Sequence, residues 1–264
     1  MCELFAMSSR YPASVSTSLE EFARHGGLTG PHKDGWGVAM YEGLDVQVVR
    51  EPAPAASSEC LRFMRERHLE SPTVIAHVRR ATQGEPALRN TQPFTRELGG
   101  RIHVFAHNGD LVGIRDARDL GAWAFRPVGD TDSEYAFCAL LESLREGWLG
   151  SHPPSVEDRV AVVTRFAESL RRLGPANFLY SDGELLFMHS HRRKHGPGES
   201  PRPPGLHVLC RSCAGQSEGP QEVVLAASAP LTAESWRPLE EGEIVVARAG
   251  KLLRRVSDAS VAVA

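Results

Sequence analysis

The sequence lacks the features that mark membrane, exported and nucleic-acid-binding proteins. No apolar run approaches the roughly 20 residues that are needed to cross a bilayer. The first residues contain no basic segment followed by an apolar one, so we expect no signal peptide. The net charge is −3, which leaves no basic excess to neutralise phosphates. We therefore predict that the protein has no membrane partner and no nucleic-acid partner.

Cysteine is also scarce, with five in 264 residues. An odd number of cysteines in a chain without an export signal favours reduced thiols and a cytoplasmic location. One of the five stands directly behind the initiator methionine, in the opening MCELFAM. Cys2 is therefore either an ordinary strand residue near a chain end or a catalytic residue.

The sequence does contain a regular order of predicted elements. Alternating or β-branched residues predict strands over 2–7, 36–42, 45–51, 73–82 and 101–114. Apolar residues at helical spacing predict helices over 18–27, 57–69, 131–148 and 155–174. From residue 177 onward the pattern is mostly strand-like, apart from a proline- and glycine-rich surface loop at about 192–205. Strands, then two helices, then strands predict an α+β fold with layered antiparallel sheets.

Cys2 has a possible catalytic function because of its place in the chain. If Met1 is removed, Cys2 carries both a thiol and a free α-amine, which titrates near about 7.7–8.0 in model compounds. Such an amine can act as a base at neutral pH beside its own nucleophile, as in N-terminal nucleophiles. The alternative is a buried thiol in a strand.

Asn108 and Gly109, in VFAHNGDL, also have two interpretations. Asn-Gly between apolar-rich runs is the strongest short signal for a hairpin with a type I′ turn. The functional interpretation is an oxyanion hole, made by the Asn108 side-chain amide and the Gly109 backbone N–H. Glycine would allow the backbone to approach a reacting centre closely.

Two more stretches contain charged residues at the ends of predicted elements. In AHVRRATQG, an arginine held at a strand end could be solvated, as we expect for Arg80, or could bind a substrate carboxylate in bidentate fashion. In TDSEYAF, Thr131 and Glu134 have the spacing of a capping box, so an acid there has a structural reason to exist. That acid could also bind a substrate ammonium. Together with a thiol and an oxyanion hole, these groups fit an α-amino acid whose side chain ends in an acyl group, such as glutamine.

These stretches resemble the motifs of the class II glutamine amidotransferases, which use an N-terminal nucleophile. The motifs occur in the family's order as MCEL, HVRRATQG, NTQPF, AHNGD and TDSE. The resemblance to the single-domain YafJ-type branch extends to GGLTGPHKDGWGVAMYEG, TQPFTRELGG and ASAPLTAESWRPLEEGE. It covers Cys2 to about Arg255, and implies one domain over 1–255 and a tail over 256–264. The fold that it implies is a four-layer αββα N-terminal-nucleophile hydrolase sandwich with two antiparallel sheets.

The resemblance also implies roles for particular residues. Cys2 would be the nucleophile, with its α-amine as the base, and Asn108 and Gly109 would form the oxyanion hole. The expected substrate-binding residues are Arg79, for the α-carboxylate, Thr82, Gln92 and, for the α-ammonium, Asp132. The resemblance implies hydrolysis of glutamine or another γ-glutamyl amide through a γ-glutamyl thioester, without a cofactor or metal. It gives no role to Arg80 and Gln83, which stand where many synthase-linked members have Trp and His.

Several functions remain open at this level. The chain could supply ammonia to a partner synthase, since no acceptor-binding domain follows, or could hydrolyse a larger γ-glutamyl conjugate without ammonia transfer. It could also be an inactive binding module that retains Met1. A zinc-binding protein is a further alternative, because histidines and cysteines occur at possible ligand spacings: His189, His191, His195, His207, Cys210 and Cys213.

Overall fold

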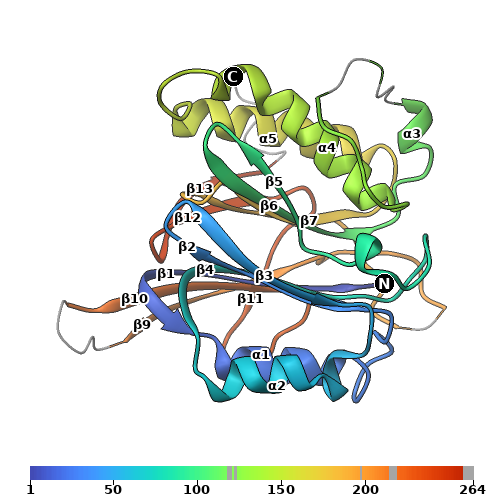
Figure 1. Cartoon of the computed structure of the whole chain (residues 1–264), viewed down its shortest axis with the longest axis vertical. Helices are drawn as coiled ribbons and strands as arrows, with labels where there is room; N and C mark the ends of the chain where they lie inside the picture. Colours follow the sequence, from blue (N-terminus) through green and yellow to red (C-terminus); the bar gives the residue numbers. More distant parts are fainter. Residues whose placement is uncertain (118–120, 122–123, 197, 214–218, 258–264) are drawn as a thin grey trace.

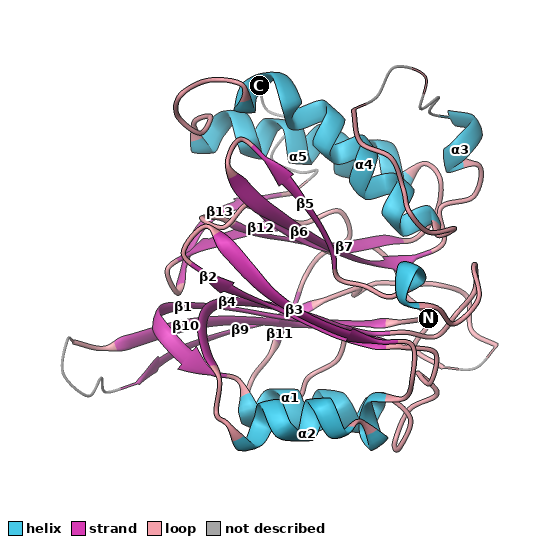
Figure 2. Cartoon of the chain, in the orientation of Figure 1, coloured by secondary structure: helices cyan, strands magenta, loops and turns pink. Residues whose placement is uncertain are grey.

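The protein is built from two antiparallel sheets stacked face to face, with helices on each outer face (Figure 1). The computed structural model describes residues 1–117, 121, 124–196, 198–213 and 219–257. Figure 2 shows the resulting layers of helix, sheet, sheet and helix. The expected α+β sandwich of four layers is therefore confirmed. Of the tail expected over 256–264, residues 258–264 lie outside the described residues.

The first sheet carries the start of the chain. Its strand order is β11 (Arg237–Pro238), β9 (His207–Cys213), β10 (Gln221–Ala227), β1 (Glu3–Ser14), β4 (Glu70–Val78), β2 (Trp36–Glu42) and β3 (Asp45–Glu51). Its outer face is covered by α1 (Ser16–His25) and α2 (Glu59–Glu66), with the short helix η1 (Ala55–Ser57) before α2. Strand β1 is a central strand, because it pairs with β10 on one side and β4 on the other.

The second sheet is formed by the middle and the end of the described chain. Its strand order is β13 (Lys251–Val256), β12 (Ile244–Arg248), β8 (Leu186–His189), β7 (Ala176–Ser181), β6 (Arg101–Gly109) and β5 (Phe94–Leu98). Helices α4 (Asp132–Leu144) and α5 (Val156–Arg171) cover its outer face. Shorter helices are η2 (Leu88–Asn90), α3 (Ile114–Ala117) and η3 (Arg145–Trp148).

Alternation along the strands produces three apolar layers. In β1, Leu4 and Ala6 enter the layer between the two sheets, whereas Phe5 and Met7 pack beneath α1 and α2. The strands of the second sheet divide their side chains in the same way between this central layer and the one beneath α4 and α5. Both sheets are thus apolar on both faces, which explains the near-continuous apolar runs in their sequences.

The helices begin where the capping residues predict. The Ser58 side chain accepts a hydrogen bond from the backbone N–H of Leu61 at the start of α2. The Thr131 side chain does the same for Glu134 at the start of α4. This second cap fixes the position of Asp132, the first residue of α4.

One edge of the sandwich gathers the ends of several strands. Glu3, at the start of β1, pairs with Val78 at the end of β4. A hydrogen bond from Gln83 to Asp110 links the loop after β4 to the loop after β6. The N-terminus lies at this edge in Figure 1. This arrangement places Cys2 beside the segments that carry the other motifs.

Candidate active site

Cys2 precedes β1 and faces the space between the two sheets. The next residue, Glu3, contacts His25 of α1, so by alternation its neighbours Cys2 and Leu4 face the opposite way. The Cys2 Sγ lies 3.3 Å from the backbone nitrogen of Arg80, which donates to it, and 3.4 Å from the Arg80 carbonyl oxygen. Burial raises the pKa of the thiol, while the Arg80 N–H and the charge of Arg79 lower it. The thiol therefore needs a base in order to become a nucleophile.

The α-amine of the chain lies in a setting that favours its neutral form. It belongs to Met1, which is present in this structure. Burial lowers the pKa of this amine, and the positive charges of Arg80, Arg193 and Lys194 lower it further, against an opposing effect of Cys2. A neutral amine can accept a proton, which is the property required of a base.

Arg79 follows the last residue of β4, and its guanidinium group is held by backbone. It donates hydrogen bonds to the carbonyl oxygens of Glu85 at 2.9 Å, Gln83 at 2.8 Å and Gly84 at 2.9 Å. The Arg79 side chain is buried, and no acid among the described residues forms an ion pair with it. A guanidinium group has five N–H donors. Three of them are engaged here, so two remain for a carboxylate.

The loop after Arg79 is tied down at two points. The Ala81 N–H donates to Asp34 Oδ2 at 2.8 Å, and Gln83 Nε2 donates to Asp110 Oδ1 at 2.7 Å. Thr82, between these two anchors, is exposed and lines a cavity beside Met1. The family resemblance implied no role for Gln83, and its bond to Asp110 provides one: it connects the Arg79 loop to the segment that follows Asn108.

The hairpin turn predicted for Asn108 and Gly109 is wrong. Both residues lie within β6, where they pair with Asn177 and Ala176 of β7, and neither has a positive φ. A Cβ atom at Gly109 would lie 1.7 Å from the carbonyl oxygen of Pro175. Glycine is therefore required here by a close backbone approach and not by turn geometry.

The Asn108 side chain is buried, yet its amide has no hydrogen-bond partner. Both Nδ2 and Oδ1 are unpaired among the described residues. Because Val104 and Ala106 face the central layer, Asn108 falls on the same face of β6, toward the first sheet and Cys2. The Asn177 side chain, by contrast, donates to the Asn108 carbonyl oxygen at 3.0 Å.

Gln92 and Asp132 are both engaged by backbone groups. Gln92 Nε2 donates to the His107 carbonyl oxygen at 3.1 Å, and its Oε1 accepts from the His107 N–H at 2.6 Å, so its amide closes a two-bond ring on β6. Asp132 accepts from the N–H groups of Leu111 and Ser133, both at 2.8 Å. The negative charge of Asp132 raises the pKa of the Cys2 thiol, which places the two residues within electrostatic range.

Two buried histidines near these residues were not identified from sequence. His107 Nδ1 lies 2.9 Å from Ser133 Oγ, beside Asp132, and burial lowers the pKa of this imidazole. On β4, His77 has no partner at either ring nitrogen among the described residues, and burial lowers its pKa to about 3. Both rings are therefore neutral at pH 7. No spacing signal marks them, because the partner of His107 lies 26 positions away and His77 has none within the described residues.

A family model for the glutamine amidotransferases class-II matches residues 1–263. The chain belongs to the class II glutamine amidotransferase family. Among relatives in this family, YafJ of Escherichia coli (strain K12) is 37% identical over 253 residues, which cover 92% of this chain and 96% of YafJ. A Haemophilus influenzae relative is 34% identical over 263 residues, covering 97% of this chain and 87% of its own length.

Solved structures of similar proteins have the same fold as this chain. The crystal structure of a predicted glutamine amidotransferase from Pseudomonas aeruginosa superimposes with a TM-score of 0.69 at 30% identity, over 96% of this chain and 100% of that one. Glutamine phosphoribosylpyrophosphate amidotransferase from Bacillus subtilis gives a TM-score of 0.63 at 16% identity, over 97% of this chain and 49% of that one. The second likeness shows that the two chains share a fold.

The described part of the chain gives no support to the zinc-binding alternative. No three His, Cys, Asp or Glu side chains within it are placed to hold a metal ion. Cys210 and Cys213 are exposed and three positions apart in β9, so they face opposite ways. Likewise, no helix in the described ranges is long and apolar enough to span a membrane.

Proposed function

We propose that the protein hydrolyses the side-chain amide of glutamine or of a γ-glutamyl amide, with Cys2 as the nucleophile. The observation that carries this proposal is the unpaired Asn108 amide, buried at the end of β6 on the face toward Cys2. A buried amide without a partner costs about 1–3 kcal/mol. A substrate oxyanion that accepts from Nδ2 would offset this cost in the transition state, as an oxyanion hole does.

The chemistry requires the free amine of Cys2 and hence removal of Met1. The amine takes the thiol proton, and the Cys2 sulfur attacks the side-chain carbonyl carbon. Asn108 and Gly109 stabilise the resulting oxyanion. The tetrahedral species then expels ammonia or an amine, which receives the proton held by the α-ammonium. Water attacks the γ-glutamyl thioester, releasing glutamate and restoring the thiol.

The α-carboxylate and α-ammonium of the substrate would bind on the side of Arg79 and Asp132. Three Arg79 N–H groups hold the loop carbonyls, so two of the five donors remain for a carboxylate. The Asp132 carboxylate is oriented by two backbone N–H groups and keeps lone pairs for an ammonium. Thr82 lies on the cavity side of the same loop, and Gln92 holds β6 at the residue before Asn108.

We treat residues 1–255 as one catalytic domain. Strand β13, at 251–256, pairs with β12 and completes the edge of the sheet that carries Asn108. A synthase partner that accepts ammonia is compatible with this chemistry. The cavity beside Met1 favours instead a substrate with a larger leaving amine, because ammonia needs only about the 30 Å³ of a water molecule and the cavity has about 730 Å³.

The proposed function can be tested by intact mass spectrometry of untagged protein, with and without 6-diazo-5-oxo-norleucine, a reactive glutamine analogue. We expect loss of Met1 and one adduct that maps to Cys2. The matched control is Cys210→Ala, which removes an exposed cysteine on β9 and should label normally. A chain that keeps Met1 and takes no label would instead support the inactive binding module.

A further inference from the structure

A cavity of about 730 Å³ lies directly beside the N-terminus. Its lining includes Met1, His32, Arg80, Thr82, Arg193 and Lys194. Arg80 connects it to the proposed nucleophile, since its backbone contacts the Cys2 sulfur and the residue is part of the cavity lining. Met1 occupies part of the wall, so its removal brings the cavity up to Cys2.

The charges that line this cavity are predominantly positive, and two of the cations have no acid partner in the part of the chain that the structure describes. Arg80 and Lys194 are exposed, and neither forms an ion pair with any acid among the described residues. The acid in the lining is Glu3, and it already binds His25 at 2.6 Å and Arg193 at 3.2 Å. The field of these cations reaches the reaction centre, because Arg80, Arg193 and Lys194 all lower the pKa of the α-amine.

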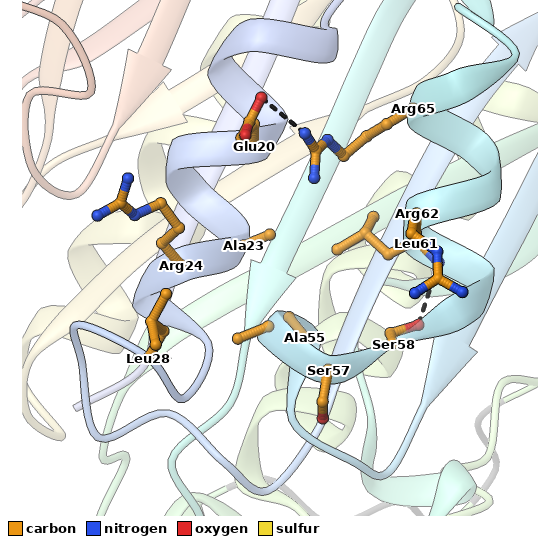
Figure 3. Close-up of a pocket in the computed structure, with 11 residues that line it drawn as sticks. Glu20, Ala23, Arg24, Leu28, Ala55, Ser57, Ser58, Leu61, Arg62 and Arg65 are labelled. Atoms are coloured by element: carbon orange, nitrogen blue, oxygen red, sulfur yellow. Dashed lines mark hydrogen bonds and ion pairs between the residues drawn. The ribbon is translucent and has the colours of Figure 1, made fainter.

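In a second surface pocket of the protein, the arginines form ion pairs with acids. It lies between α1 and α2 and has about 450 Å³ (Figure 3). There Arg65 binds Glu20 at 2.6 Å, and the two side chains point toward each other in Figure 3. Arg24 pairs with Glu21 at 3.7 Å, and Arg62 pairs with acids of its own helix. The three arginines of this pocket thus have acid partners, in contrast to Arg80 and Lys194 in the cavity beside Cys2.

Arg79 and Arg80 divide the site into two halves. Arg79 points into its own loop, on the side where the glutamyl group would bind, whereas Arg80 lines the cavity. The thiol contacts the Arg80 backbone and lies within the field of the Arg79 charge. A substrate attacked by Cys2 thus has its glutamyl part toward Arg79 and its leaving amine toward Arg80 and Lys194.

Building on the proposed function, we propose that this cavity binds an anionic group on the leaving amine, so that the preferred substrates are γ-glutamyl amides of carboxylate- or sulfonate-bearing amines. Arg80 and Lys194 are the residues that select the anion. In the complete reaction, γ-glutamyl-NH–R and water give glutamate and H₂N–R, with R carrying the negative charge. Free glutamine, which has no such group, would bind on the Arg79 side and make no contact with Arg80 and Lys194.

The experiment compares amides of similar length but different charge. The substrates are γ-glutamylglycine, γ-glutamyltaurine, γ-glutamylglycinamide and the monoamide of ethylenediamine. We expect kcat/KM to be about tenfold or more higher for an anionic leaving amine than for the neutral glycinamide, and lowest for the cationic one. The ratio of the carboxylate to the sulfonate amide identifies which anion the cavity prefers.

Two variants locate the effect. Arg80→Gln and Lys194→Gln should each reduce the glycine-to-glycinamide ratio of kcat/KM by about threefold to tenfold. Lys251→Gln, which removes an exposed lysine on β13 that is paired with Glu222, should leave this ratio unchanged.

The outcomes separate the two proposals. Turnover of neutral and anionic amides at equal rates would overturn the anion preference while leaving the proposed function in place. The anion preference would also be overturned if Arg80→Gln and Lys194→Gln both keep the wild-type ratio of kcat/KM for γ-glutamylglycine to kcat/KM for γ-glutamylglycinamide. Failure to hydrolyse every amide, in protein shown by mass to have lost Met1, would overturn the proposed function and this inference with it.

Discussion

The two sides of Cys2 differ in how their polar groups are held. On the Arg79 side, the guanidinium group, the Gln92 amide and the Asp132 carboxylate are each fixed by backbone hydrogen bonds. On the cavity side, Arg80 and Lys194 are exposed and unpaired within the described structure. A preorganised half suits a part of the substrate that never varies, and an open, charged half suits a part that differs between substrates.

The largest expected effect comes from the residue between the two halves. Cys2→Ala removes the nucleophile and should reduce kcat for any γ-glutamyl amide by about 10⁴-fold or more. Thermal unfolding should change little, because the thiol makes only weak contacts with Arg80. Turnover of purified variants, with Cys210→Ala as the matched control, checks this prediction. Residual activity within tenfold of the wild type would remove Cys2 from the mechanism.

Asn108 and Asn177 lie opposite each other on the adjacent strands β6 and β7. We expect substitution of the first to affect activity and substitution of the second to affect stability. Asn108→Ala should reduce kcat roughly 10²–10³-fold without loss of stability, since its amide has no partner to lose. Asn177→Ala removes hydrogen bonds to the backbone of Asn108, Arg192 and His191 and should destabilise the fold by roughly 1–3 kcal/mol or more.

Steady-state kinetics and urea denaturation of both asparagine variants make this comparison. If Asn108→Ala unfolds at a lower urea concentration and keeps a normal kcat, the Asn108 amide has a structural role and the oxyanion assignment fails.

The two adjacent arginines test the contrast between the halves most directly. Arg79→Lys loses the planar guanidinium group and its three carbonyl bonds, so we expect KM for the γ-glutamyl substrate to rise about 10–100-fold. Arg80→Lys keeps the charge at an exposed position and should change kcat/KM by less than about threefold. Equal losses of kcat/KM in Arg79→Lys and Arg80→Lys would contradict the proposed difference between a preorganised half and an open half of the site.

The smallest effect concerns the pH profile. A lowered amine pKa leaves the amine neutral, and able to accept the thiol proton, at a lower pH. These cations lower the pKa of the Met1 amine, and we expect them to act likewise on the amine of Cys2, one residue further along, after Met1 is lost. Lys194→Gln removes one positive charge, so the pKa of the amine should rise and the acidic limb of kcat/KM should move upward by about 0.3 pH unit.

The pH profile should be measured with γ-glutamylglycinamide, whose leaving amine carries no anionic group, so that loss of anion binding by Lys194 does not affect the result. Lys251→Gln should leave the limb where it is. A shift toward lower pH in Lys194→Gln would contradict the proposed role of the amine as the base.

The sequence predicted those parts of the fold that depend on local pattern. Strands 36–42 and 45–51 coincide with β2 and β3, because alternation and a two-residue connection specify this hairpin. Ser58 and Thr131 mark the starts of α2 and α4 through their side-chain bonds. The layered arrangement followed from the order of the elements, and its four layers from the family resemblance.

The errors and omissions occurred where distant partners decide the structure. Asn108-Gly109 is a good hairpin signal by itself, but pairing with β7 keeps it extended. The predicted surface loop at about 192–205 contains a backbone bridge between Arg193 and Arg202. Gln83 reaches Asp110 and His107 reaches Ser133 across 27 and 26 positions, and no local pattern encodes such contacts.

The central place of β1 in its sheet has a consequence for how the protein is made. The strand that follows Cys2 pairs on one side with residues 221–227, which are synthesised more than two hundred residues later. Strand β1 cannot pair with β10 until residues 221–227 have emerged from the ribosome. The surroundings of Cys2 are thus completed only after residues 221–227 have been synthesised, so its thiol passes through synthesis in an unfinished fold.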